Sequence, residues 1–148
     1  MNACKKIVFL IFVTYLSCQN EVQSNSESII FEESKWKLVG IVDSKSGSIK
    51  ELEPKDCMNC YYLTFETDSQ ISGRAAGNLI IGFFEVNYEK QSLYFKKIEI
   101  VTEIMEYGDE KFFINILKSV KSFFFKNEEL RLYYNDQKNY LKFKMNES

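Results

Sequence analysis

The sequence predicts an α+β fold in which a curved, barrel-like antiparallel β-sheet of about eight strands wraps on a single α-helix. Apolar and polar residues alternate with a period of two from Ser34 onward. Short polar turns interrupt this alternation, which is typical of antiparallel strands. One segment near residues 110–120 changes to a helical period. Since a single helix cannot cover both faces of a flat sheet, a curved sheet around it is the economical arrangement.

The predicted strands are separated by turns rich in Asp and Asn, whose side chains bond the nearby backbone and tolerate left-handed conformations. Strands are expected near residues 35–42, 61–66, 71–75, 79–87, 93–101, 123–126, 130–134 and 140–144. Turns are expected at residues 43–47, 67–70, 87–90, 127–129 and 135–138. No internal repeat or second domain is visible, so these elements are expected to form one domain.

The predicted helix lies between the fifth and sixth strands and has one apolar face. Its apolar residues recur at i, i+3, i+4 and i+7; they are Phe113, Ile116, Leu117 and Val120. Asp109 is placed to cap the amino end, and Glu110 follows where a negative charge suits the helix dipole. Lys118 and Lys121 suit the carboxyl end.

The first seventeen residues have the three regions of a secretory signal peptide. Lys5 and Lys6 provide the positive region, and residues 7–16 form an apolar stretch. This stretch has the length typical of a signal and is too short for a membrane span, which needs about twenty residues. A small residue before Cys18 completes a lipobox-like ending. A buried N-terminal helix with an incidental cysteine is the alternative, but the polar segment 19–28 that follows favours a tether.

We therefore predict that residues 1–17 are removed, that residues 18–33 form a flexible tether lipidated at Cys18, and that residues 34–148 form the folded domain. Several fatty acyl chains such as palmitate would hold the mature protein stably on a membrane, which one chain does not do. Gln19 stands where many lipoproteins retained at the inner membrane carry Asp. Resemblance to that sorting rule favours an outer-membrane location in the cell envelope.

The composition excludes several classes of function. The chain has no histidine and no GxxxxGK[ST] or GxGxxG sequence, so Ser-His-Asp, Cys-His and HExxH sites are excluded. The net charge of −2 becomes −4 without the two lysines of the signal, and no basic run offers a site for a nucleic acid. We expect no catalytic residue, metal site, cofactor or nucleic-acid partner, and we predict that the protein is not an enzyme.

Cys57-Met-Asn-Cys60 is the sharpest local motif. It could form a local structural disulfide, two free thiols, a redox dithiol or half of a metal site. Zinc needs four ligands, and a redox dithiol normally begins a helix, whereas this motif leads into a predicted strand. An oxidising compartment favours the structural disulfide.

Three other motifs have ordinary structural interpretations. The glycines from Gly73 to Gly82 lead into a strand, so a bent hairpin or bulge is favoured over a phosphate-binding loop. The three phenylalanines at 123–125 are interpreted as core residues, since the negative net charge disfavours RNA stacking. Carboxylates in turns could form a calcium loop or a glycosidase-like pair, although turn geometry explains them; they are Asp68, Asp109, Asp136 and Glu106.

The tyrosines are a candidate binding face, because Tyr offers rigid contact area at low entropic cost. Half of such positions in strands are expected to point to the core instead. The set comprises Tyr61, Tyr62, Tyr88, Tyr94, Tyr107, Tyr133, Tyr134 and Tyr140.

A series of short motifs runs through residues 35–145. The segment from Gly73 through Asn78 to Gly82 and Phe84 parallels the pattern G-x-x-G-C-N-x-x-x-G-x-Y. The other motifs, in chain order, are Trp36-Lys-Leu-Val39, Leu63-Thr-Phe65, Thr102, Glu110-Lys-Phe-Phe113-Ile-Asn-Ile-Leu117, Leu130-Arg-Leu132 and Leu141-Lys-Phe143. In this order and spacing they resemble the META domain, the family of the heat-shock lipoprotein HslJ.

The resemblance implies a META/HslJ-like fold and an envelope location. It implies no catalytic residue, because the family has no generally assigned enzymatic activity. Ala76-Gly77 stands where the family has Gly-Cys, and Glu106 stands at the position of a second family Cys. The disulfide sometimes drawn between those two family positions is therefore impossible in this chain.

Two hypotheses for the function follow. The first is a membrane-anchored lipoprotein whose non-enzymatic domain binds an envelope protein or another envelope component, in connection with stress. The alternative is a small-molecule or glycan carrier with a lipocalin-like cavity. A filled interior would favour the first, and a large internal cavity would favour the second.

Overall fold

The structure, a computed structural model, describes residues 31, 33–102, 105 and 107–146. The predicted signal peptide and Cys18 lie outside these described residues. In chain order, the elements of the described part are β1 (Ser34–Asp43), β2 (Ile49–Lys50), β3 (Tyr62–Phe65), the 3-10 turn η1 (Thr67–Ser69), β4 (Gln70–Arg74), β5 (Leu79–Asn87), β6 (Ser92–Ile100), α1 (Glu110–Ser119), β7 (Ser122–Lys126), β8 (Glu129–Tyr134) and β9 (Asn139–Met145).

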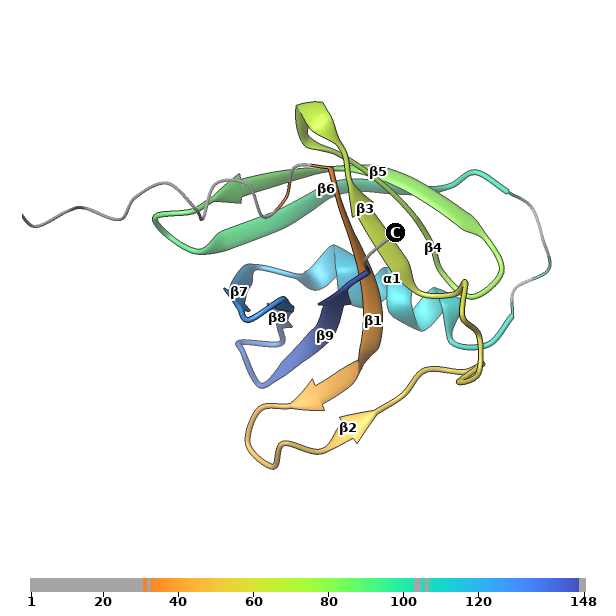
Figure 1. The fold of residues 1–148 in the computed structure, drawn as a ribbon, viewed down its shortest axis with the longest axis horizontal. Helices are drawn as coiled ribbons and strands as arrows, with labels where there is room; N and C mark the ends of the chain where they lie inside the picture. The colour runs from red at the N-terminus through yellow and green to blue at the C-terminus, as the bar shows by residue number, and fades with distance from the viewer. Residues whose placement is uncertain (1–30, 32, 103–104, 106, 147–148) are drawn as a thin grey trace, which may run out of the picture.

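Eight of these strands form a closed antiparallel barrel (Figure 1). Neighbours pair in the order β1-β3-β4-β5-β6-β7-β8-β9, and β9 returns to pair with β1. The short β2 lies outside this ring and pairs with the end of β1. The predicted α+β fold, a curved antiparallel sheet around one helix, is confirmed.

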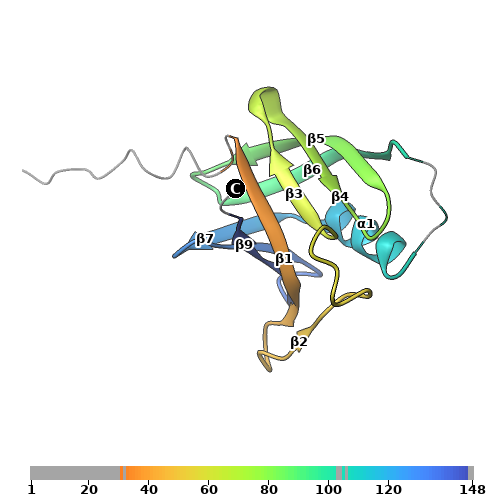
Figure 2. The same ribbon diagram turned by 45° about the vertical axis from the view of Figure 1, so that its right-hand side comes forward.

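The barrel is joined very differently at two places. β1 pairs with β9 over residues 36–43. In contrast, β6 and β7 meet only at the pair Ser92↔Ser122, and we call this joint the seam. Beyond that pair β6 and β7 are not hydrogen-bonded to each other in the described part of the chain, and Figures 1 and 2 both place α1 under the β5–β6 arm.

α1 presents its apolar face to the barrel interior, as the helical period predicts. Phe113 and Leu117 are fully buried. The ring of Phe113 meets that of Tyr61 edge-on, with centroids 5.3 Å apart. The helix ends one residue before the predicted end, because Val120 has an extended backbone.

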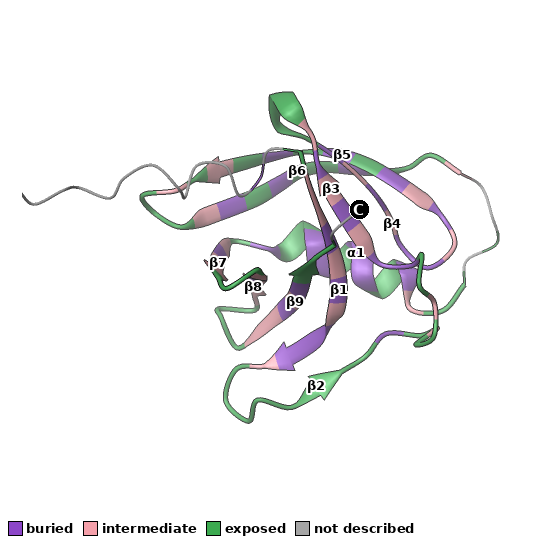
Figure 3. Ribbon diagram, viewed as in Figure 1, coloured by how far each residue is buried: buried purple, intermediate pink, exposed green. Residues whose placement is uncertain are grey.

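Large buried side chains fill the interior of the barrel. Figure 3 shows buried positions alternating with less buried ones along the strands, which is the period of two seen in the sequence. The largest side chains that are less than 2% exposed include Trp36, Phe31, Phe65, Phe113, Phe143, Leu63, Ile71, Ile80, Leu93, Leu117, Leu130 and Leu132.

Phe31 corrects the predicted start of the packed region. The sequence placed it in the tether at residues 18–33, because regular alternation begins only at Ser34. The structure buries its ring to 1% exposure, with centroids 4.6 Å from Phe65 and 5.0 Å from Phe123. Packing on residues distant in sequence, which no local period reveals, extends the folded part to Phe31.

The turns show the expected chemistry, whereas β2 was not predicted. Asn127 and Glu128 both have positive φ angles, 51° and 60°, as in the primed turns that suit the twist of a two-residue hairpin. Both residues of β2, Ile49 and Lys50, are exposed. A strand of two exposed residues has no alternation by which a sequence could reveal it.

Candidate functional site

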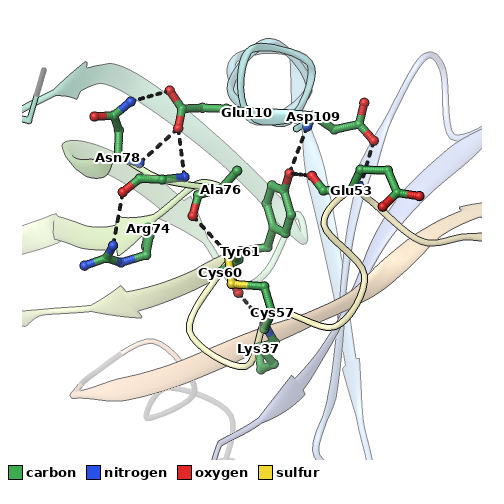
Figure 4. The surroundings of a disulfide bond; sticks show 11 residues. Lys37, Glu53, Cys57, Cys60, Tyr61, Arg74, Ala76, Asn78, Asp109 and Glu110 are labelled. Atoms are coloured by element: carbon green, nitrogen blue, oxygen red, sulfur yellow. Dashed lines mark hydrogen bonds between the residues drawn. A yellow bond between two sulfur atoms is a disulfide. The ribbon is translucent and has the colours of Figure 1, made fainter. Parts of the chain in front are cut away.

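Cys57 and Cys60 form a disulfide in the loop between β2 and β3 (Figure 4), with Cα atoms 5.4 Å apart. Cys60 is 3% exposed, and its Sγ lies 2.9 Å from the carbonyl oxygen of Ala76. This is a contact and not a hydrogen bond, because a disulfide sulfur carries no hydrogen. Among the four interpretations of the motif, the structure contains the local disulfide.

Lys37 of β1 holds the disulfide loop on the barrel. Its ammonium donates to the carbonyl oxygen of Cys57 at 2.9 Å and also to that of Cys60. Burial lowers the pKa of this lysine. Because both acceptors belong to the main chain, the contacts fix the path of the loop.

Tyr61 joins the same loop to the start of α1. Its hydroxyl donates to the carbonyl of Glu53 and accepts the N–H of Asp109 at 3.0 Å. Burial raises the pKa of Tyr61 to about 12. Gly108 has a φ of +62°, and a Cβ there would collide with the carbonyl oxygen of Glu53, so the close approach of the two segments requires glycine.

Asp109 occupies the predicted N-cap position of α1, but its side chain makes no capping hydrogen bond. Instead, Oδ2 accepts the main-chain N–H of Glu53 at 3.0 Å. The predicted cap is wrong in its bonding, because the main-chain N–H of Glu53, a donor 56 residues away in the sequence, binds the carboxylate that would otherwise cap the helix.

Glu110 is a buried carboxylate, 2% exposed, that fastens α1 to the turn between β4 and β5. Oε2 accepts the main-chain N–H groups of Gly77 and Asn78 at 3.2 and 3.0 Å, and Oε1 accepts Nδ2 of Asn78 at 2.7 Å. Thr102 donates to Oδ1 of Asn78 at 2.9 Å and accepts the N–H of Leu79. These polar groups are used by the fold itself (Figure 4).

A cleft opens on the outside of the barrel at the seam. It consists of two adjoining hollows of about 420 and 230 Å³ that share four lining residues. The lining comes from the β5–β6 turn, β6, β7, the end of β8 and the β8–β9 turn. It comprises Lys90, Gln91, Ser92, Tyr94, Lys121, Ser122, Phe123, Phe124, Tyr133, Tyr134, Asp136 and Gln137, and we call it the seam cleft.

Three tyrosines from two strands face this cleft. Tyr94 of β6 is 47% exposed, and Tyr133 and Tyr134 at the end of β8 are half-buried. Tyr134 also packs against the core, and burial raises the pKa of its hydroxyl. The cleft therefore offers aromatic faces and phenolic hydroxyls that are fixed by the strands.

Two lysines give the cleft its charge. Lys90 and Lys121 are exposed at its rim, and neither forms an ion pair with another residue of the described chain. Asp136 is the carboxylate that lines the larger hollow. The rim thus carries two ammonium groups and one carboxylate, on a chain whose net charge is −2.

A rigid cluster on β7, β8 and β9 flanks the cleft. Arg131 lies over the rings of Phe124 and Tyr140, at 5.6 and 5.1 Å from their centroids. Glu129 accepts from Arg131 and from Lys142, both at 2.7 Å. Burial opposes the charge of Glu129, but these two hydrogen bonds outweigh it and hold its pKa below the ordinary value.

A comparison with known proteins supports one relationship by sequence. No protein-family model matches the chain. The chain is 32% identical over 113 residues to a Tannerella forsythia protein described as "Putative lipoprotein", and the match covers 75% of this chain and 72% of that protein. The chain belongs to the same family as that protein.

Two solved structures are similar to this chain in fold. A DUF4847 family protein from Bacteroides vulgatus aligns with a TM-score of 0.64 at 18% identity, over 82% of this chain and 98% of that one. A Burkholderia xenovorans protein, solved by NMR, aligns with a TM-score of 0.63 at 16% identity, over 82% and 87%. These similarities show a shared fold.

The described turn carboxylates lie in different places: Asp68 in η1, Asp109 before α1 and Asp136 in the β8–β9 turn. Glu106 lies outside the described residues, and within the described ranges no group of three or more His, Cys, Asp or Glu side chains could hold a metal ion. In the same ranges no helix is long and apolar enough to cross a membrane. Gly73 and Gly82 lie inside β4 and β5, where a Cβ would collide with a carbonyl of the neighbouring strand.

The tyrosine set predicted from the sequence divides between several places. Tyr61 is in the core, Tyr62 lies under the ammonium of Lys35, and Tyr94 faces the seam cleft. Sequence reasoning missed Lys90, Lys121 and Gln137 as cleft residues. They belong to three separate connections and carry no motif. Only knowledge that β6 pairs with β7, which brings these connections together, would have identified them.

Proposed function

We propose that this protein is a membrane-anchored envelope lipoprotein whose non-enzymatic, META/HslJ-like domain binds an envelope component in the seam cleft. Three sequence features support the anchor: the signal-like residues 1–17, the lipobox-like ending at Cys18 and the polar segment after it. Kinship with a protein described as a lipoprotein supports it further.

A buried network supports the META/HslJ-like assignment. Asn78, Thr102 and Glu110 each match a different motif of that family, and they are distant in sequence. All three meet in one set of hydrogen bonds that fastens the helix to the barrel. If this chain has the META/HslJ-like architecture, the one network explains why all three motifs are present.

The seam cleft is the observation that carries the binding role. It is an outer hollow of the size typical of small-ligand sites, lined by fixed tyrosines and by lysines without ion pairs. The carrier alternative needs an internal cavity, and the side chains of Trp36, Phe65 and Phe143 fill the barrel interior. This weighs toward a ligand bound on the outside.

The positions of the buried polar groups support a non-enzymatic role. Tyr61, Glu110 and Lys37 have hydrogen bonds to the protein's own main chain. None of the three lines the seam cleft. General acid–base catalysis by any of these three buried groups would need that group within reach of a bound ligand.

Metabolic labelling with a clickable fatty acid tests the anchor. The wild-type protein should be labelled and should fractionate with the outer membrane, whereas Cys18→Ser should remain unlabelled. Equal labelling of both proteins would refute the anchor.

Photo-crosslinking in the native envelope tests the cleft. A photoreactive phenylalanine analogue is placed at Tyr94 or, as a matched control, at Phe83 on the neighbouring strand; both side chains are 47% exposed, but only Tyr94 lines the cleft. A crosslinked product should form from position 94 and not from position 83. Identical products, or none from position 94, would refute binding in the cleft.

A further inference from the structure

We propose that the ligand of the seam cleft is a saccharide that carries a carboxylate group. This inference rests on the proposed function, since it takes the cleft to be a binding site, and it adds the chemical class of the ligand. The larger hollow of about 420 Å³ continues into the smaller one of about 230 Å³. The two hollows share four lining residues, and together they have room for a short chain of sugar rings.

The lining matches the two kinds of surface that a sugar ring presents. A pyranose has C–H groups on its faces and hydroxyls around its edge. Tyr94 and Tyr133 supply aromatic surface for the C–H face and hydroxyls beside it, as amphipathic tyrosines do at other binding surfaces. Ser92, Ser122 and Gln137 add small polar groups that both donate and accept hydrogen bonds.

The lysines select the charge of the ligand. Lys55, Lys96, Lys97 and Lys142 each have a carboxylate partner. Lys90 and Lys121, like most lysines of the described part of the chain, have no such partner, and what distinguishes them is that both approach the same hollow from different turns. A carboxylate on the ligand would form charge-assisted hydrogen bonds with them.

The carboxylate of Asp136 suits the hydroxyls of a saccharide. It lines the same hollow as Lys90 and Lys121 and can accept hydrogen bonds from sugar hydroxyls. A nucleic acid binds to continuous basic surfaces, which two lysines beside a carboxylate do not form. The neighbouring Arg131 and Lys142 both pair with Glu129 and do not line the cleft.

Calorimetric titration of the full, detergent-solubilised protein tests the proposal with two probes of equal length, trigalacturonate and neutral galactotriose. Trigalacturonate should bind at least about tenfold more tightly, the contribution of roughly one charge-assisted contact. The Lys90→Gln/Lys121→Gln variant should remove that preference, and added salt should weaken trigalacturonate binding. Tyr94→Ala should weaken binding of both probes.

Two variants serve as matched controls. Phe83→Ala removes an aromatic side chain of the same exposure as Tyr94, and Lys111→Gln removes an exposed lysine of α1. Neither residue lines the cleft, so both variants should bind trigalacturonate as the wild type does. Thermal unfolding of each variant verifies that it is folded.

The outcomes separate this inference from the proposed function. Equal binding of both probes, or an unchanged preference in the double lysine variant, would overturn the carboxylate. Binding of neither probe, together with an envelope protein crosslinked at position 94, would overturn the saccharide and leave the proposed function standing. Binding of neither probe without any crosslink at position 94 would overturn both.

Discussion

The two joints of this barrel, β1 with β9 and β6 with β7, close the same sheet by different means. β1 and β9 share a long antiparallel ladder with one bulge between Leu38 and Gly40, so main-chain hydrogen bonds fix their relation. β6 and β7 share one pair, and α1 packs against β6 with Phe113 and Leu117 in the core. The joint with the shorter ladder is also the place where an outer cleft forms. Ligand binding is thus expected at the β6–β7 joint, where the ladder is shortest.

The largest expected effect tests how much the packing of α1 stabilises the barrel. Truncation of Phe113, which is fully buried, should cost about 3–5 kcal/mol in the free energy of unfolding, because a cavity is left in the core. Urea titration of Phe113→Ala measures this loss. Lys118→Ala, on the exposed side of the same helix, is the control. Equal midpoints for the two variants would contradict the role of the helix.

A smaller effect is expected where the helix is fastened to the barrel. Glu110→Gln replaces one acceptor oxygen by an NH₂ group that faces the donors of Gly77 and Asn78. The resulting unsatisfied donors should cost about 1–3 kcal/mol. Chemical unfolding measures the free energy of unfolding of Glu110→Gln and of Glu128→Gln, an exposed control. Were the two variants equally stable, the network would not fasten α1.

Tyr61 adds a pH dependence to the same end of the helix. Burial raises its pKa to about 12, above the value of about 10 for an unfolded tyrosine. The neutral form is favoured in the folded state, so its contribution is complete below pH 10 and is lost as the pH rises toward 12. Phenolate absorbance of the wild type minus that of Tyr61→Phe should show one tyrosine that titrates near pH 12. A difference centred near pH 10 would refute the burial of the hydroxyl.

The smallest effect is expected at Glu129 of β8, which pairs with Lys144 of β9 beside the β1–β9 ladder. Its pKa is lowered by Lys142 and Arg131, so its contribution is present above about pH 4.3, the ordinary value, and is lost as the pH falls through the folded value. The pair is partly exposed, which limits the contribution to about 0.3–1 kcal/mol. The stability difference between wild type and Glu129→Gln should be measurable at pH 7 and should shrink as the pH falls below the ordinary value. A constant difference would show that charge is not its origin.

The sequence predicted the strands well because alternation is a local property. Each of the eight predicted strands agrees with the observed one to within one residue at either end, and the helix agrees through the spacing of Phe113 and Leu117. The seam could not be predicted, since the alternation of β6 is the same whether or not its edge is paired. Phe31 was missed for a similar reason, because its partners are distant in sequence.

The candidate site was partly visible in the sequence. Tyr94, Tyr133 and Tyr134 belonged to a tyrosine set without a known arrangement, and only the register at Ser92↔Ser122 gathers them in one place. Asp109 was correctly placed at the start of the helix, but its bond to Glu53 depends on a loop whose path no local rule determines.

The burial of Phe31 has a mechanical consequence for an anchored protein. Thirteen residue steps separate it from Cys18, which allows a reach of at most about 45 Å. A pull transmitted along this segment meets the ring of Phe31 before it meets the ladder of β1 with β9. That ring packs on Phe123 of β7, and Phe123 also lines the seam cleft. In the proposed anchored protein, tension on the tether and occupancy of the seam cleft would therefore act on the same strand.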